Sequence, residues 1–462
     1  MSKIPGRFVC ERFDYNMRMS RSYLTRPILL IMVGAVLRLL FLGSKSLWFD
    51  EASTLFLASH PLGELASWLV RNEVNPPLYY AVMHAWLKAF ADPRIGLRLF
   101  SVLCGAASLL AFRVLAYKIL PERARLPALM LAVASSFWIH IAQDGRSYSL
   151  LLLVSLLSTL ATLELSEKPS RKLWAAYAAL ASFGLYTHYY YAILLAGHAT
   201  WLASQRPRWR DFAAAHAAVV LFFAPWFSRL ASQTQAHVGD PVLGEALSPA
   251  RILDLLGTTF FDVGFLGLAL PGWTGVVIGA GVLALIICAG REEKRPFYFS
   301  LVHLGAGLAL VTAVELWSGR PVTQARYFTP LSPMLLLLAA LGSRRRWVQA
   351  ATAVVLVAGT AGYFFSAVLV DPRLDALSAM IRNSSDQSVP VVHLGKYYYL
   401  PLRFYYLPER RHLLVAEQAV GMDYRGMSPY PGVIEDKDLP GLGPCVVVDE
   451  SRTVTPNRVL LG

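Results

Sequence analysis

Long apolar runs separated by short polar loops dominate the first 370 residues of the chain. A helix needs roughly 17 to 25 apolar residues to cross about 30 Å of hydrocarbon. Runs of about that length predict eleven spanning helices, at about residues 27–43, 97–117, 126–142, 148–165, 172–187, 189–204, 212–227, 269–289, 297–315, 327–342 and 347–369. The pattern therefore predicts an α-helical polytopic membrane protein.

Positive charges mark one side of this predicted helical array, because loops on the cytoplasmic side of a membrane collect Lys and Arg. Such clusters occur at the N-terminus and at Lys118/Arg123/Arg125, Lys168/Arg171/Lys172, Arg206/Arg208/Arg210, Arg291/Lys294/Arg295 and Arg344/Arg345/Arg346. Each successive pair encloses apolar sequence for one helix out and one helix back, with outer turns near residues 44–98, 143–147, 187–190, 228–268 and 316–326. We therefore expect a multi-pass protein of the cytoplasmic or inner cell membrane, with residues 1–26 in the cytoplasm and the C-terminus outside.

One apolar run is short for a span. Pro77–Ala91 contains His84 and Lys88, and counting it as a span would send five basic clusters to the wrong side. It therefore predicts a helix lying in the outer interface, within an outer loop of residues 44–96.

The character of the chain changes after Val370, where charged and turn residues appear. Short strand-like runs, "VPVVHL", "LRFYYL" and "PCVVVDE", predict a small extracytoplasmic α/β domain over residues 371–462. Residues 27–370 then form a separate transmembrane domain.

Composition supports the membrane assignment and excludes two other classes. A mean hydropathy of +0.46, with 55% hydrophobic and only 16% charged residues, is too apolar for a soluble protein of 462 residues. The net charge of +13 lies in loop clusters without a basic stripe or nucleic-acid motif, so nucleic acid is not an expected partner. The four cysteines have neither paired nor metal-ligand spacing.

Polar residues converge on the predicted outer ends of the helices, where ionisable groups are costly unless they are solvated, paired or used. They are Asp50, Glu51, Glu73, Asn75, Asp144, Arg146, His188, Arg320, Arg326 and Tyr327. Carboxylates and arginines on one side suit a reaction in which a hydroxyl loses its proton and a phosphate leaves. A carboxylate can be the general base, and the planar fork of arginine binds phosphate oxygens. We expect Asp50 to be the base, and Arg146 and Arg326 to bind the phosphate.

Five blocks of the sequence carry a family resemblance: "SLWFDEAS", "NPPLYYAVMHAWLKAF", "FWIHIAQDGRSYSLLLL", "GLYTHYYYAILLAGHATWL" and "ARYFTPLSPMLLLLAA". Together, in order over about residues 27–342, they resemble the GT-C superfamily of integral-membrane glycosyltransferases. The chain is most similar to the bacterial branch related to protein O-mannosyltransferases and the lipid A aminoarabinose transferase. The tail "LGKYYYLPLRFYYLPE" also resembles the outer domain of this branch.

The resemblance implies a mannosyltransferase-like enzyme of the cell envelope, a hexosyl- or pentosyltransferase. It would move a sugar from a polyprenyl-phosphate donor to a lipid, glycan or protein hydroxyl on the extracytoplasmic face, with inversion. Asp50 matches the acidic position of the family's first outer loop, taken as base or acceptor-orienting carboxylate, and Glu51 accompanies it. Arg146 matches the Arg of a Gln-acid-x-Arg-x-Tyr block, and Arg326-Tyr327 match a late Arg-Tyr pair. The expected binding set is completed by His188, Asn75, Glu73 and Asp144.

The chain departs from this branch at two positions. Ser53 stands where the branch has an Arg, and Asn75 stands where it has a Lys before the Pro-Pro pair. Both cations are expected to touch the carrier phosphate, so the donor sugar or carrier of this chain can differ. No cofactor is required by the residues; Asp50 and Glu51 leave a divalent metal open, because no ligand spacing compels one.

Simpler interpretations exist for each residue. Asp50 and Glu51 also fit a solvated helix start, Arg146 and Arg326 fit interface arginines, and Asp144 fits a partner that neutralises Arg146. The rival functions are a transporter or flippase of lipid-linked sugars, a polysaccharide ligase or polymerase, and a membrane-anchored binding module. Transporters place ionisable residues near the bilayer midplane, whereas the charges here gather at one face, which favours an enzyme.

Overall fold

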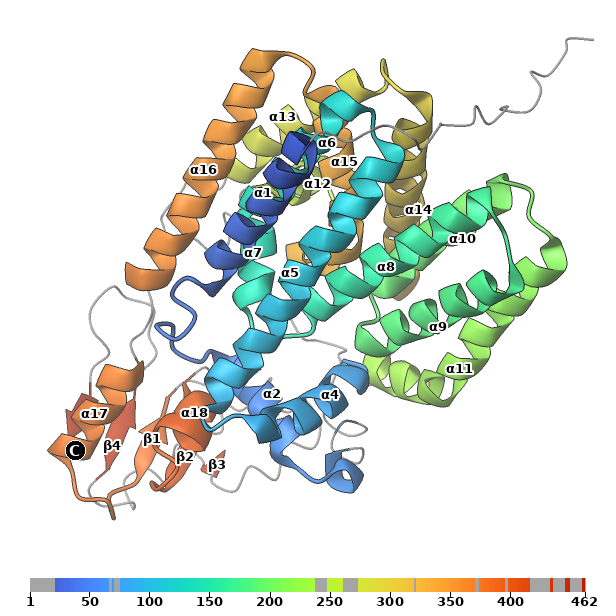
Figure 1. The fold of residues 1–462 in the computed structure, drawn as a ribbon. Helices are drawn as coiled ribbons and strands as arrows, with labels where there is room; N and C mark the ends of the chain where they lie inside the picture. Colours follow the sequence, from blue (N-terminus) through green and yellow to red (C-terminus); the bar gives the residue numbers. More distant parts are fainter. Residues whose placement is uncertain are drawn as a thin grey trace, which may run out of the picture.

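The protein is a helical bundle with a small sheet at one end (Figure 1). The computed structural model describes residues 21–65, 69, 75–236, 247–260, 273–319, 321–369, 374–394, 398–415, 433–434, 445–448 and 459–461. The helices before the sheet are α1 (Arg21–Leu39), α2 (Phe49–Ser59), α4 (Leu78–Trp86), η1 (Leu87–Ala89), α5 (Pro93–Ile119), α6 (Glu122–Ala134), α7 (Ser136–Gln143), α8 (Tyr148–Glu167), α9 (Arg171–Thr187), α10 (Tyr191–Ser204), α11 (Trp209–Ala236), α12 (Pro249–Thr258), α13 (Thr274–Ala289), α14 (Lys294–Ser318), η3 (Ala325–Leu331), α15 (Ser332–Gly342) and α16 (Arg346–Leu369).

Apolar helices confirm the predicted membrane fold. Six helical stretches in the described part of the chain are long and apolar enough to cross a membrane, or seven if the bent pair α6–α7 is one span. The other predicted spans also coincide with helices, but α9, α10 and α13 have only 17, 14 and 16 residues. The predicted number of eleven spans is therefore not confirmed. The run at Pro77–Ala91 forms the nine-residue α4 followed by one turn of 3-10 helix, far too short for a span.

The predicted outer connection at residues 228–268 contains a helix that the sequence analysis did not predict, α12. A start signal was present in the sequence: Ser248 caps the helix by accepting from the Arg251 backbone N–H at 3.1 Å, and Pro249 follows it. α12 packs closely against α13 because Gly279 of α13 has no side chain at the contact. A Cβ at Gly279 would lie 1.7 Å from the carbonyl oxygen of Leu253.

The break between α6 and α7 fixes the position of the loop that follows α7. The two helices meet at an angle of 47°, and the buried Arg38 guanidinium donates to the freed carbonyls of Ala132 and Val133 at 3.2 and 3.5 Å. In return, Gln143 at the end of α7 donates to the carbonyls of Arg38 and Leu40 at 3.0 and 2.8 Å. Arg38 of α1 thus caps the end of α6, and Gln143 of α7 caps the end of α1, so the loops that leave α1 and α7 begin side by side.

The basic loops meet at one end of the bundle. Ion pairs there join Lys118 to Glu164, Arg123 to Glu292, Arg344 to Glu292 and Arg295 to Glu167. In Figure 1, α2, α4 and the sheet lie at the opposite end from α6, α13 and the start of α16. The 27-residue α5 connects the two ends over about 40 Å. The structure thus separates a basic end from a second end that holds Asp50, and which of them faces the cytoplasm stays a prediction.

The C-terminal part contains the predicted small α/β structure. Its elements are α17 (Leu374–Ser384), β1 (Val391–His393), α18 (Tyr399–Pro401), the π-helix η4 (Leu402–Tyr406), β2 (His412–Val415), β3 (Val433–Ile434), β4 (Val446–Val448) and β5 (Val459–Leu461). The strand order is β3-β2-β1-β4-β5, with parallel pairs throughout except the antiparallel pair of β4 and β5. The runs "VPVVHL" and "PCVVVDE" contain strands as predicted. The domain boundary at 370/371 stays a prediction.

The run "LRFYYL" is not a strand, contrary to the prediction. It forms η4, and Leu402 and Tyr406, four residues apart, are buried in one cluster. The aromatic side chains also bind the first outer loop: the Tyr406 hydroxyl accepts from the backbone N–H of Leu47 at 3.0 Å, and the Tyr405 hydroxyl donates to Asp92 at 2.8 Å. Tertiary contact therefore overrides the strand preference of aromatic residues and packs the C-terminal domain beside Asp50.

Candidate active site

The structure brings Asp50, Arg146 and Arg326 together from three distant parts of the chain. Asp50 lies in the first turn of α2, where the helix dipole favours a negative charge. Its Oδ2 lies 3.4 Å from Arg326 Nη1 and 3.9 Å from Arg146 Nε. The carboxylate therefore lies between two guanidinium groups. Because the Asp50 side chain is 23% exposed, a substrate can still reach it.

Arg146 is the more buried of the two cations, with a side chain only 9% exposed. It lies in the loop after α7, and its Nη1 donates to the Asp50 carbonyl at 3.2 Å, to Thr54 Oγ1 at 3.0 Å and to the Tyr80 hydroxyl at 3.3 Å. Because α2 and α4 both hold this guanidinium, the fold itself fixes its position.

Arg326 is the more open cation, with a side chain 32% exposed. It lies at the start of η3, and its Nε donates to Gln324 Oε1 at 2.9 Å. The guanidinium carbon lies 5.9, 5.8 and 5.7 Å from the ring centres of Trp48, Tyr148 and Tyr327, which is cation–π range. Arg326 can therefore turn toward an incoming anion while its aromatic surroundings keep it in place.

His188 lies beneath these cations in an aromatic layer. Its ring centre is 5.4 Å from that of Tyr148 and 5.7 Å from that of Tyr327, and Tyr327 stacks on Tyr190 at 4.3 Å. Burial, and then the nearby Arg146 and Arg326, lower the pKa of the His188 imidazole to about 3. Since its Nδ1 accepts from the Tyr190 backbone N–H at 3.2 Å, the neutral ring carries its proton on Nε2. His188 thus offers a hydrogen-bond donor and not a third positive charge.

Glu51 has a different environment from its neighbour Asp50. Its side chain is 1% exposed, and it accepts from Arg98 Nε at 2.8 Å, from Arg98 Nη2 at 2.6 Å and from the Gly145 backbone N–H at 2.8 Å. Arg98 also donates to the carbonyls of Leu42, Lys45 and Ser46 at 2.8 to 3.0 Å. The carboxylate of Glu51 is therefore committed to holding the first outer loop against α5 and the loop after α7.

Asp144 is buried and accepts from Trp48 Nε1 at 3.0 Å. Burial, and then the neighbouring Glu51 carboxylate, raise the pKa of the Asp144 carboxyl above its ordinary value. A carboxyl whose pKa is higher in the folded state stabilises the fold most at low pH, where it is protonated in both states. That stability is lost as pH rises from the ordinary value through the raised one.

Asp144→Asn removes this titration and keeps an oxygen for Trp48. We expect the stability of the variant relative to the wild type to increase between pH 4 and 7, by about 1.4 kcal/mol for each unit by which the pKa is raised. Thermal unfolding of both proteins in detergent across that range measures the difference. A difference that stays constant with pH would contradict the raised pKa.

Comparison with known proteins identifies the fold that carries these residues. Residues 74–229 match the family model for dolichyl-phosphate-mannose-protein mannosyltransferases. Over almost the whole chain, the fold is similar to that of ArnT from Cupriavidus metallidurans in the apo state, with a TM-score of 0.63, 14% identity, and coverage of 93% of this chain and 94% of that one. The chain has the fold of the GT-C glycosyltransferases. The predicted family resemblance is thereby confirmed.

ArnT from the same organism bound to undecaprenyl phosphate is similar to the same degree, with a TM-score of 0.62, 15% identity, and coverage of 93% of both chains. The Pmt1-Pmt2 complex of S. cerevisiae, bound to its sugar donor, also matches, with a TM-score of 0.35, 13% identity, and coverage of 53% of this chain and 37% of that one. Comparison with curated protein sequences finds no match.

The remaining predicted residues of this GT-C fold are placed less closely around Asp50. Asn75 is half-buried in the turn before α4, and Glu73 lies outside the described residues. Ser53, at the position of the missing arginine, is buried on α2. The described residues contain no group of three His, Cys, Asp or Glu side chains that could hold a metal. The carboxylates of Asp50 and Glu51 are held by different arginines, an arrangement that does not fit a metal ion shared between them.

Several residues of the site were not predicted. Thr54 and Tyr80 hold Arg146, Tyr148 and Tyr190 form the aromatic layer, and Arg98 anchors Glu51. Two of them carried a signal in the sequence. Arg98 is a charged residue inside a predicted span, which is costly without a partner, and Tyr148 ends the "QDGRSY" block that supplies Arg146.

Proposed function

We propose that this protein is a membrane glycosyltransferase that moves a sugar from a polyprenyl-phosphate donor to an acceptor hydroxyl on the extracytoplasmic face, with Asp50 as the base. The observation that carries the proposal is the Asp50 carboxylate lying between Arg326 and Arg146, at 3.4 and 3.9 Å. One similar protein and the matching family support the donor class: ArnT is described bound to undecaprenyl phosphate, and the family is named for dolichyl-phosphate-mannose.

The chemistry follows from the charges. The acceptor oxygen forms a bond to the sugar's anomeric carbon as the bond from that carbon to the phosphate oxygen breaks. The hydroxyl proton passes to the Asp50 carboxylate, and the carrier phosphate leaves with the bonding electron pair. Arg146 and Arg326 stabilise the charge that develops on this phosphate. Attack on the face opposite to the leaving phosphate inverts the anomeric configuration.

The two arginines have unequal roles in this proposal. Arg146 is held by α2 and α4, so it supplies a preorganised charge at the leaving oxygen. Arg326 is more exposed and pairs with Asp50. A phosphate that binds Arg326 competes with the Asp50 carboxylate for the guanidinium, so donor binding frees the base. The Nε2–H of neutral His188 would donate to an oxygen of the donor in the same space.

This arrangement favours transfer over transport. The Asp50, Arg146 and Arg326 groups lie together at one end of the bundle, whereas transporters place such groups near the bilayer midplane. The buried Arg38, which lies within a helix, is committed to backbone carbonyls.

The proposal is tested by incubating purified protein in vesicles with a panel of polyprenyl-phosphate sugars and candidate acceptors, and measuring glycosylated product and released polyprenyl phosphate. We expect Arg146→Ala to lower kcat and Arg326→Ala chiefly to raise the KM for donor. Each loss should be about 10- to 100-fold, because a hydrogen bond to a charged group contributes about 1.5 to 3 kcal/mol. Arg171→Ala, at the exposed start of α9, is the matched control and should leave both constants unchanged.

Two results would count against the proposal. One is movement of the lipid-linked sugar across the vesicle membrane without product for any donor, which is the behaviour of a flippase. The other is an equal loss of activity in Arg171→Ala, which would show that the loss of a surface charge alone explains the effect.

A further inference from the structure

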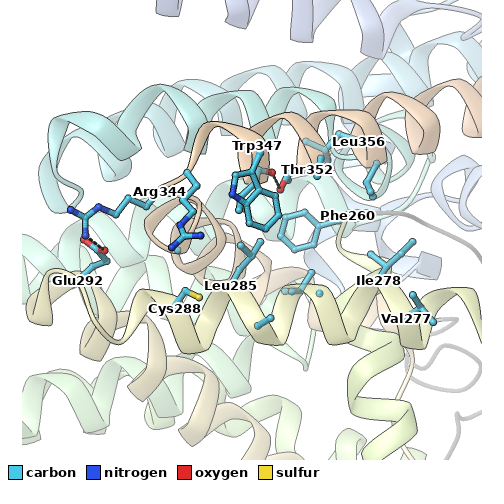
Figure 2. A pocket seen from close by; sticks show the side chains of 18 of the residues that line it. Phe260, Val277, Ile278, Leu285, Cys288, Glu292, Arg344, Trp347, Thr352 and Leu356 are labelled. Carbon is cyan, nitrogen blue, oxygen red and sulfur yellow. Dashed lines mark hydrogen bonds and ion pairs between the residues drawn. The ribbon is translucent and has the colours of Figure 1, made fainter.

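A groove lies between α13 and α16, at the basic end of the bundle and away from Asp50. It encloses about 700 Å³. Figure 2 shows Leu285, Ile278 and Val277 along α13 facing Trp347, Thr352 and Leu356 along α16. The Thr352 hydroxyl donates to the Val348 carbonyl of its own helix at 2.8 Å, so the walls are effectively apolar. A groove of this kind offers a place for a hydrocarbon chain.

The mouth of the groove is positively charged. Arg291, Arg344 and Arg345 line it together with one acid, Glu292. Glu292 pairs with Arg344 at 3.3 Å and also with Arg123. In the described part of the chain, the exposed side chains of Arg291 and Arg345 make no ion pair or hydrogen bond. The mouth therefore presents two uncompensated guanidinium groups to the membrane surface.

The length of the groove matches one leaflet of a bilayer. The wall from Trp347 to Leu356 rises about 14 Å along α16, and the wall from Val277 to Cys288 rises about 17 Å along α13. Half of a hydrocarbon core of about 30 Å is about 15 Å. Trp347 is 66% exposed beside the arginines, the position in which tryptophan marks the interface with lipid headgroups. The arginines therefore lie at headgroup level when the apolar walls lie among acyl chains.

We propose that this groove binds an anionic phospholipid, with its phosphate at Arg291 and Arg345 and an acyl chain between α13 and α16. A basic pocket between spanning helices is a recognised form of lipid headgroup site, and the charge at the mouth selects an anionic over a zwitterionic headgroup. The polyprenyl-phosphate donor is not the expected occupant, because its phosphate must reach the Asp50 end of the bundle. The site is separate from the proposed transfer reaction and does not depend on it.

Native mass spectrometry of the full-length protein tests the headgroup site, with titration of dioleoyl phosphatidylglycerol against dioleoyl phosphatidylcholine. We expect the wild type to prefer phosphatidylglycerol by roughly tenfold or more, from the attraction of two arginines. The double variant Arg291→Gln/Arg345→Gln should lose this preference. Arg171→Gln/Lys172→Gln, an exposed basic pair at the start of α9, should keep it.

A second pair of variants tests the acyl-chain site with all charges intact. A Cβ at Gly281, which lines the groove, has no atom within 4 Å, and the same holds for Gly305 on α14, which does not line it. Gly281→Leu should fill the groove and weaken binding of both lipids, whereas Gly305→Leu should not. Equal affinity of the wild type for the two lipids would overturn the proposal. So would a preference that survives Arg291→Gln/Arg345→Gln, or displacement of phosphatidylglycerol by equimolar polyprenyl phosphate.

Discussion

Asp50→Asn is expected to lower the rate of sugar transfer by about 10² to 10⁴-fold, the usual contribution of a general base. The substitution keeps the size of the side chain and its place in the first turn of α2, but an amide cannot accept the acceptor's proton. Donor binding should not weaken, because Arg326 and Arg146 lose a competing carboxylate 3.4 and 3.9 Å away and become more available to phosphate.

The distinguishing measurement is therefore kcat together with the affinity for the polyprenyl-phosphate donor. Asp211→Asn, in the first turn of α11, is a matched control and should transfer sugar at the wild-type rate. A fall in kcat with unchanged or tighter donor binding fits a base. Full activity of Asp50→Asn would remove Asp50 from the chemistry, and weaker donor binding with an unchanged kcat would make it a donor-binding residue.

The placement of Asp50, Arg146 and Arg326 at one end of the bundle was predictable from the sequence, and their contact was not. Basic loops sort helix ends by side, so residues in alternate loops share a face. The sequence does not say how helices pack around one another, and here packing decides which ends meet. The capping of α6 by Arg38 and of α1 by Gln143 brings the Asp50 and Arg146 loops together.

Local sequence preference does not predict the secondary structure of segments that long-range contacts hold. The run "LRFYYL" has the composition of a strand, but it forms η4 because Tyr405 and Tyr406 bind Asp92 and Leu47 of the first outer loop. The helix α12 was missed although its Ser-Pro start was readable, because the segment was too short to predict as a span.

The adjacent acids Asp50 and Glu51 show the same limit. In sequence they are equivalent, but successive residues of a helix point about 100° apart. Asp50 therefore turns toward Arg326, while Glu51 turns into the bundle toward Arg98. Glu51 was expected to help in catalysis, and its contacts support a positioning role in which it holds the loop that carries Asp50.

Glu51→Ala is accordingly expected to destabilise the protein by about 3 to 5 kcal/mol, the cost of leaving one partner of a buried ion pair alone. The Glu51 and Arg98 side chains are only 1% and 2% exposed, so solvent cannot replace the lost carboxylate, and the Gly145 N–H loses its acceptor as well. Unfolding in mixed micelles with a rising fraction of denaturing detergent measures this loss. Transfer activity should fall with stability, because Asp50 is on the helix that Glu51 anchors.

Glu51→Gln separates a positioning role from a catalytic one. The amide oxygen of the introduced side chain would still accept from Arg98 or the Gly145 N–H, so the variant should recover part of the stability lost in Glu51→Ala. If Glu51 only positions the loop, activity should return in proportion to stability. If Glu51→Gln is as stable as the wild type and still inactive, its carboxylate takes part in the reaction. The burial of Glu51 and its three hydrogen bonds favour the first outcome.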